Sequence, residues 1–393
     1  MTDWKIARLA DNDRSVLLVI LILALALRVT AAFLLPDQHF SDAEGYREAA
    51  KSLWATGRIG NYVIMPLYPA LLAIVGPGWG QLGLDIVLST AMVALVYQLT
   101  LAIFPDRVAA ALAALVAAFY PYFIFYAVVG LTETLFIVLL LGAFLCWFRG
   151  WFTAAALLAV LSVLTRPTIE LLVPILILVF ALFIHRLPLK QAFRHLAIFA
   201  CIYGILMSPW WLHNYRQYRT FVRLNAGSGL MFYSANNPMN QSGGALDADS
   251  NRKQFEHIAD PLARDRAMWA AGLDYVKENP GRFVELAGLK FVRFWRLWPY
   301  AQEYTSRFHV VLSLLSFAPV LAFAIVYVAR CRRREFILIS PILLLTAYLT
   351  VVHMILGASL RYRLPLEPFL ICFAALAVTQ LVRRWRTGRS MAE

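Results

Sequence analysis

Long runs of apolar residues, separated by short polar connections, occupy most of the chain. A helix that crosses a bilayer needs about 20 mainly apolar residues, and most of these runs approach that length. Such an order of segments is typical of a helical membrane protein. The pattern predicts about ten spanning helices, at residues 15–36, 82–104, 107–128, 131–148, 151–165, 168–185, 193–211, 308–329, 336–356 and 363–382.

The composition supports the same class of fold. Of the 393 residues, 61% are hydrophobic and only 15% are charged. A soluble domain has about half apolar and about a quarter charged residues. This chain therefore has more apolar surface than a soluble fold of its length can bury. We expect an all-α polytopic membrane protein, surrounded by membrane lipids.

The net charge of the chain is +13, and the distribution of its basic residues indicates how the chain is oriented in the membrane rather than what it binds. The basic residues fall mainly in the short connections, and with a cytoplasmic N-terminus every basic cluster lies on the cytoplasmic side, as the positive-inside rule requires. We therefore predict cytoplasmic termini and an even number of spans, and exclude nucleic acid as a partner. The clusters comprise Arg107; Arg149; Arg186, Lys190 and Arg194; Arg330, Arg332, Arg333 and Arg334; and Arg383, Arg384, Arg386 and Arg389.

This orientation divides the chain into three parts. Residues 1–211 form an N-terminal transmembrane module whose first outer loop is 37–81. Residues 212–307 form an extramembrane loop domain, and residues 308–393 contain the last spans and a basic tail. The last outward turn, 357–363, is short.

The loop domain is predicted to be largely helical. Its first stretch, from Asn225 to Asp249, is polar and is predicted to be a loop. Residues 262–278 have a helical pattern that ends at an Asn-Pro-Gly stop signal. Residues 282–298 combine aromatic and basic side chains, a pattern typical of a helix that lies at the membrane interface.

Three acidic residues lie at the outward ends of apolar runs. Asp42 and Glu44 follow the first span, in the first turn of a predicted helix, where acidic residues also stabilise a helix start. Glu133 follows Thr132 at the mouth of the fourth span. An acidic residue at the edge of the hydrocarbon is costly, which marks it as a functional candidate. Helix capping is the alternative for all three.

Three arginines lie on the outward side, and two of them, Arg361 and Arg363, stand against the positive-inside bias. Arg166 begins a turn before Pro167, and Glu170 is one turn further on, so a structural Arg166–Glu170 ion pair is the alternative to a functional role for Arg166. Arg361 and Arg363 lie in the last outward turn. A guanidinium group binds phosphate through two hydrogen bonds, so these side chains predict an anionic partner. Anchoring to lipid headgroups is the alternative.

Other site chemistries find no support in the sequence. There is no His or Cys spacing typical of a metal site and no phosphate-binding glycine loop. The sequence names no cofactor, and a requirement for a divalent cation stays open.

Seven segments of the chain form a recognisable series. In chain order they read SDAEGYREAAKSLWATGRI, MPLYPALLAIVG, LTETLF, LTRPT, PWWLHNYRQYRTFVRLNAGSGLMFYSANNP, ENPGRFVELAGLKFVRFW and LRYRLPLEPFL. Together they resemble the GT-C class of membrane glycosyltransferases, in particular bacterial relatives of the protein O-mannosyltransferases and the aminoarabinose transferases. In those relatives, an Arg often stands where this chain has His213, before Asn214.

The resemblance implies a bundle of about ten spans that transfers a sugar, with inversion of the anomeric configuration, from a polyprenyl-phosphate donor to a lipid, glycan or protein hydroxyl. It places the active site on the periplasmic face of a bacterial inner membrane. A glycan polymerase or ligase, or a transporter of lipid-linked sugars, is the alternative.

The resemblance also implies roles for individual residues. Asp42 would be the base, and Glu44 and Glu133 would position the acceptor, the base or a metal. Arg361, Arg363, Arg166 and Tyr362 would bind the lipid phosphate. Further substrate contacts would come from Tyr46, Tyr68, His213 and Asn214.

Overall fold

The structure is a computed structural model that describes residues 11–35, 40–61, 63–244, 248–300 and 304–389. The described residues form helices and connections, and no strand occurs among them. The helices are α1 (Asp11–Leu34), α2 (Ser41–Thr56), α3 (Leu67–Val75), α4 (Trp79–Ile103), α5 (Arg107–Phe119), α6 (Pro121–Tyr126), α7 (Glu133–Phe148), α8 (Phe152–Thr165), η1 (Pro167–Ile169), α9 (Val173–Val179), η2 (Phe180–Ile184), α10 (Leu189–Tyr218), α11 (Ser228–Ala235), α12 (Ala248–Lys253), α13 (Pro261–Glu278), α14 (Pro280–Trp295), α15 (Arg307–Arg330), α16 (Arg333–Leu356), α17 (Leu360–Arg363), η4 (Leu364–Leu366) and α18 (Glu367–Arg389).

The prediction of an all-α polytopic membrane protein is confirmed. Among the described residues, six helices are long and apolar enough to cross a membrane, and four shorter apolar helices accompany them. Each of the ten predicted apolar runs overlaps one of these helices, and the run at 107–128 also includes α6. The shorter four lie at 107–119, 133–148, 152–165 and 173–184.

The core of the bundle is built around α7, which is buried along almost its whole length and packs against α4 and α8. Helix α5 approaches α4 and α18 closely because alanines line its buried face. On the outer helices, large apolar side chains point away from the core, such as Val19, Ile205 and Leu315. These exposed side chains fit a lipid solvent, in which apolar surface carries no cost.

Arg28, inside the first span, needs a partner at that depth. Its Nε donates to the Ser89 hydroxyl at 2.7 Å, and its Nη1 donates to the carbonyl oxygens of Ala24 and Ala118 at 3.0 and 3.1 Å. The side chain is fully buried, so it ties α1 to α4 and to the end of α5.

The segment after α10 is more helical than the sequence predicts. Helix α11 and the start of α12 fall within the stretch that was predicted to be a loop, residues 225–249. Gly229 allows α11 to lie against the backbone of α13, since a Cβ there would meet the Asp265 carbonyl. The predicted stop between two helices is correct, because α13 ends at Glu278 and α14 begins at Pro280.

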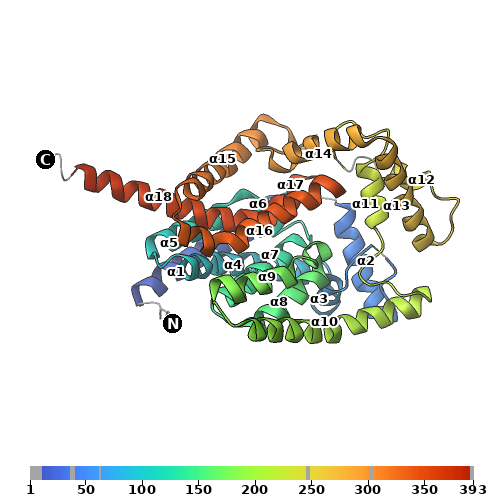
Figure 1. Ribbon diagram of the computed structural model, residues 1–393, viewed down its shortest axis with the longest axis horizontal. Helices are drawn as coiled ribbons and strands as arrows, with labels where there is room; N and C mark the ends of the chain where they lie inside the picture. Colours follow the sequence, from blue (N-terminus) through green and yellow to red (C-terminus); the bar gives the residue numbers. More distant parts are fainter. Residues whose placement is uncertain (1–10, 36–39, 62, 245–247, 301–303, 390–393) are drawn as a thin grey trace.

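The two ends of the bundle differ in character. In Figure 1, α11, α12 and α13 gather at one end of the long axis, and α18 projects at the other. The start of α2, the start of α7, the end of α8 and the short α17 come together through side-chain contacts. This meeting point of four chain segments contains the candidate site.

Candidate active site

Arg361 joins two acidic residues that are far apart in the sequence. Its Nη1 donates to Asp42 Oδ2 at 2.5 Å. Its Nε donates to Glu133 Oε1, and its Nη2 lies 3.4 Å from Glu133 Oε2. One guanidinium therefore links the first turn of α2 to the first residue of α7.

Arg166 completes this group. Its Nη1 donates to Glu133 Oε1 at 2.5 Å and to Thr132 Oγ1 at 3.2 Å. Two arginines and two carboxylates then balance in charge. The alternative of an Arg166–Glu170 ion pair is wrong: Glu170 instead pairs with Arg223 at 2.9 Å, because Arg166, at the end of α8, turns toward α7.

Asp42 is the open member of this quartet, which comprises Asp42, Glu133, Arg166 and Arg361. The side chain of Asp42 is 52% exposed, whereas that of Glu133 is 1% exposed. Glu133 is enclosed by the two arginines and fixes them in place. Of the two carboxylates in the quartet, that of Asp42 is therefore the one positioned to meet a molecule that arrives from outside.

A cavity of about 570 Å³ opens beside the quartet, and Arg361 forms part of its wall. Aromatic rings from α6 and from the chain after α14 make up much of the rest. Arg293 and Arg296 also line it, and both guanidinium groups lie over the Tyr300 ring, at 3.8 and 4.9 Å from its centroid. The cavity thus combines an apolar aromatic surface with three positive charges.

The two cavity arginines were not among the residues predicted for the site. Arg293 and Arg296 belong to the aromatic and basic stretch at 282–298, which the sequence predicts to lie at the membrane interface. The end of α14 faces the cavity. The sequence feature that could have identified these two arginines as cavity residues is their alternation with aromatic residues.

A second polar network, formed by residues of α3 and α4, packs against α2. Tyr46 makes an edge-to-face contact with Tyr68, at 5.5 Å between ring centroids. The Tyr68 hydroxyl donates to Asp85 Oδ2 at 2.7 Å and accepts from Gln81 Nε2 at 3.1 Å. Burial raises the pKa of the Tyr46 phenol, while Arg361 acts in the opposite direction. Tyr46 therefore stays protonated beside the quartet.

Glu44 lies outside the quartet. Its carboxylate is 3.6 Å from Arg47 Nη1 and is 56% exposed. Arg47 Nε in turn donates to Gln81 Oε1 at 2.9 Å, so Glu44 is connected to the network that supports α2.

Arg363 points away from Asp42 and into the protein. It is fully buried, its Nε donates to Glu367 Oε1 at 2.8 Å, and its Nη1 donates to the Arg296 carbonyl at 2.6 Å. Between the two arginines, Tyr362 stacks on His353 at 4.5 Å and lies beneath Arg166. Arg361 and Arg363 thus face different surroundings.

His213 and Asn214 lie apart from the quartet. His213 lines another cavity, of about 660 Å³, at the far end of α2, and accepts a hydrogen bond from the Ile59 N–H at 3.0 Å if Nε2 is unprotonated. Asn214 is buried and donates to the Val222 carbonyl at 3.2 Å. Both residues shape the segment that follows α10.

No group of three or more His, Cys, Asp or Glu side chains within the described ranges is arranged to hold a metal ion. The acidic residues of the quartet are instead held by arginines.

The fold matches that of known membrane transferases. The archaeal oligosaccharyltransferase AglB from Archaeoglobus fulgidus, in complex with an inhibitory peptide and a dolichol-phosphate, is 13% identical with a TM-score of 0.61, over 97% of this chain and 51% of that chain. The oligosaccharyltransferase of the same organism, tethered with an acceptor peptide, is 14% identical with a TM-score of 0.60, over 96% and 50%. ArnT from Cupriavidus metallidurans bound to undecaprenyl phosphate is 15% identical with a TM-score of 0.45, over 94% and 59%.

The chain spans about half the length of the oligosaccharyltransferase that it matches. No protein-family model and no curated protein sequence matched it. The likeness establishes the fold, which is that of the GT-C membrane glycosyltransferases, the class that the sequence motifs resemble.

Proposed function

We propose that the protein is a glycosyltransferase that moves a sugar from a polyprenyl-phosphate donor to the hydroxyl group of an acceptor. The observation that carries this proposal is the exposed Asp42 carboxylate, held by Arg361 at the wall of an aromatic cavity with two further arginines. The GT-C fold supports it, and the oligosaccharyltransferase with this fold binds a dolichol-phosphate.

The cavity suits a lipid-linked phosphate. Its aromatic walls would bind the first isoprene units, and Arg293, Arg296 and Arg361 would neutralise the phosphate. Since Arg361 already binds Asp42, an arriving phosphate would compete with that carboxylate. The exchange would release Asp42 at the moment when a donor is bound.

The transfer itself is a single displacement. Asp42 accepts the proton of the acceptor hydroxyl. The acceptor oxygen forms a bond to the anomeric carbon while the bond from that carbon to the phosphate oxygen breaks, and its electron pair stays on the polyprenyl phosphate. Arg361 stabilises the charge that develops on this leaving group. The anomeric configuration is inverted.

The remaining predicted residues have supporting roles in this proposal. Glu133 and Arg166 hold Arg361 in position. Tyr46, Tyr68 and Glu44 stabilise the start of α2, and Arg363 with Tyr362 fixes the turn that presents Arg361. His213 borders the second cavity, where we place an acceptor contact, and the buried Asn214 holds the segment after α10 through the Val222 carbonyl. The site would face the periplasm from a bacterial inner membrane, with both termini cytoplasmic.

The test uses the full chain in proteoliposomes with undecaprenyl phosphate linked to a radiolabelled pentose or hexose, together with a membrane extract as the acceptor source. The proposal predicts label in the extract and release of undecaprenyl phosphate for one of these donors. Absence of transfer with every donor, from protein with a normal unfolding transition, would contradict it. The donor that reacts identifies the sugar class.

A further inference from the structure

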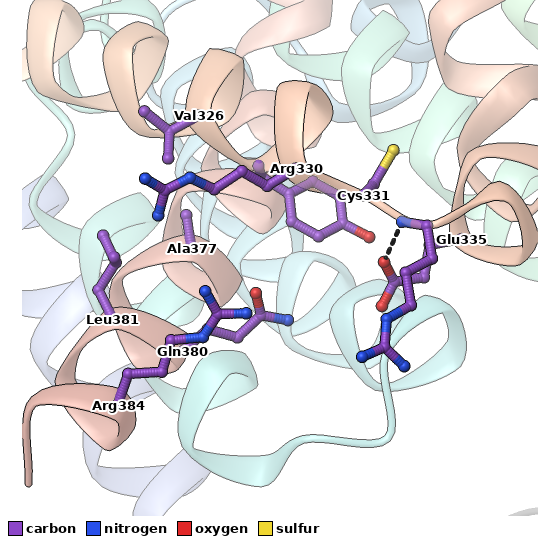
Figure 2. Close-up of a pocket in the computed structure, with 10 residues that line it drawn as sticks. Val326, Arg330, Cys331, Glu335, Ala377, Gln380, Leu381 and Arg384 are labelled. Carbon is purple, nitrogen blue, oxygen red and sulfur yellow. Dashed lines mark hydrogen bonds between the residues drawn. The ribbon is translucent and has the colours of Figure 1, made fainter. Parts of the chain in front are cut away.

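A small polar pocket lies at the end of the bundle where α15 stops and α16 begins. Its volume is about 140 Å³, and α18 forms its other side. Figure 2 shows Arg330 on one side of the opening, with Gln380 and Arg384 on the other and Glu335 to the side. The pocket is large enough for a phosphate group and too small for a sugar chain.

The pocket is well separated from the Asp42 site. Helix α16 begins at the pocket and ends beside the segment that contains Arg361. It has 24 residues, which at the α-helical rise correspond to about 36 Å. A molecule in this pocket therefore cannot be a substrate that touches Asp42.

Three arginines line the pocket against one carboxylate. They are Arg330, Arg332 and Arg384, and the carboxylate is that of Glu335. Glu335 Oε2 accepts the Arg332 backbone N–H at 2.8 Å, so it is engaged in capping α16. Within the part of the chain that the structure describes, no carboxylate pairs with Arg330 or Arg332. The pocket has an excess of positive charge.

Tyr327 provides an independent indication of a ligand. The residue is 3% exposed and lines the pocket, yet its hydroxyl has no hydrogen-bond partner among the described residues. A buried hydroxyl without a partner costs about 1–3 kcal/mol. The ring packs against Phe104 at 5.2 Å and Phe373 at 5.5 Å, so it cannot readily swing away to find another acceptor.

We propose that this pocket binds a phosphate group, which accepts a hydrogen bond from the Tyr327 hydroxyl and ion pairs from Arg330, Arg332 and Arg384. An anionic lipid headgroup and a free phosphate ion share this chemistry. Apolar side chains on the outside of α15, such as Ile325, are exposed beside the pocket, so a headgroup phosphate can reach it from the bilayer. A bound phosphate would connect the ends of α15, α16 and α18.

The test measures the unfolding temperature of the full-length protein in detergent, as a function of added phosphatidylglycerol, phosphatidylcholine or sodium phosphate at constant ionic strength. Three variants are compared with the wild type. Tyr327→Phe removes only the hydroxyl, and Arg332→Gln removes one pocket charge. Arg334→Gln is the matched control, because Arg334 is in the same basic segment but does not line the pocket.

We expect phosphatidylglycerol to raise the unfolding temperature where phosphatidylcholine does not. Tyr327→Phe and Arg332→Gln should each raise the phosphatidylglycerol concentration needed for half of this rise about tenfold. Arg334→Gln should change that concentration less than about twofold. Without ligand, Tyr327→Phe should unfold at the wild-type temperature or above, since it removes an unsatisfied hydroxyl. A response to sodium phosphate with the same dependence on Tyr327 would also support the site and identify the free ion as its source.

Three results would overturn the proposal. One is an equal loss of response in Arg334→Gln and Arg332→Gln, which would indicate attraction to the basic surface as a whole. The second is a response that Tyr327→Phe leaves unchanged, and the third is no response to either phosphatidylglycerol or sodium phosphate.

Discussion

Arg361 donates a hydrogen bond to Asp42 at 2.5 Å, although the two residues are 319 positions apart in the chain. This contact joins the first outer helix to the last outward turn. The proposed base, Asp42, therefore stays paired with the Arg361 guanidinium until another anion binds that guanidinium. We propose that this anion is the donor phosphate, so that binding of the donor releases the Asp42 carboxylate.

The role of Arg361 in binding the donor is tested by its affinity for undecaprenyl phosphate. Arg361→Gln should weaken binding about tenfold or more, because a charge-assisted contact to phosphate is lost. The measurement is a titration of purified protein with undecaprenyl phosphate in detergent. Arg223→Gln is a suitable control, since Arg223 pairs with Glu170 outside the cavity. Equal affinity of Arg361→Gln and the wild type for undecaprenyl phosphate would show that Arg361 does not bind the donor phosphate.

Arg363 is expected to behave differently from Arg361. It forms a buried ion pair with Glu367, in which both side chains are fully buried. Removal of one partner leaves a buried charge alone and costs about 3–5 kcal/mol. Arg363→Gln should therefore lower the unfolding temperature strongly, and any folded fraction should bind undecaprenyl phosphate as the wild type does. A stable Arg363→Gln variant with weakened binding would instead support the phosphate-binding role predicted from the sequence.

Glu133 is predicted to be necessary for both stability and activity. Glu133→Gln leaves Arg166 and Arg361 without their shared carboxylate, so the protein should lose about 3 kcal/mol of stability and transfer should fall sharply. Thermal unfolding and the transfer assay measure the two effects. Glu44→Gln is the control, because the Glu44 side chain is 56% exposed and its pair with Arg47 should contribute less than about 1 kcal/mol.

The membrane class and the positions of the apolar helices could be predicted well from the sequence, because the length and composition of each apolar run are properties of that segment alone. The sequence also identified Asp42, Glu133, Arg166 and Arg361 as separate candidates. It did not predict that Glu133 would hold both arginines, and it paired Arg166 with the nearer Glu170. Contacts across 228 positions, such as that of Arg361 with Glu133, depend on how helices pack, which no local pattern specifies.

The cavity arginines show a second limit of sequence reasoning. Arg293 and Arg296 have the pattern of an interfacial helix, and the same pattern suits a wall of an aromatic cavity. Only the packing of α14 against α16 and α17 determines which surface these side chains face. Lys290, on the same helix, is likewise fully buried although its residue type is usually exposed.

Lys290 should make stability depend on pH. Burial lowers the pKa of its ammonium group from 10.5 to about 8. Between these values the unfolded chain binds more protons than the folded protein, so stability should rise with pH from about 8 to about 10.5 and remain lower below pH 8. The rise should be about 3 kcal/mol at most. Unfolding by denaturant at several pH values measures it, and Lys290→Met should flatten the curve. An unchanged slope in that variant would assign the rise to other groups.

Gly130 is expected to tolerate no side chain. Its φ is +72°, and a Cβ there would lie 2.4 Å from Gln81 Nε2, whose amide donates to the Gly130 carbonyl. Gly130→Ala should cost about 1–3 kcal/mol through backbone strain and displacement of Gln81. Gly60→Ala provides the comparison, because a Cβ at Gly60 meets nothing within 4 Å. Equal unfolding temperatures for the two variants would contradict this prediction.

The most direct measurement is the rate of sugar transfer by Asp42→Asn in proteoliposomes, with the donor that the wild type consumes. The substitution keeps the size of the side chain and removes its basicity. We predict that transfer falls by about 100-fold or more, while expression, unfolding temperature and affinity for undecaprenyl phosphate are maintained. Transfer at the wild-type rate by a correctly folded Asp42→Asn protein would contradict the assignment of Asp42 as the base.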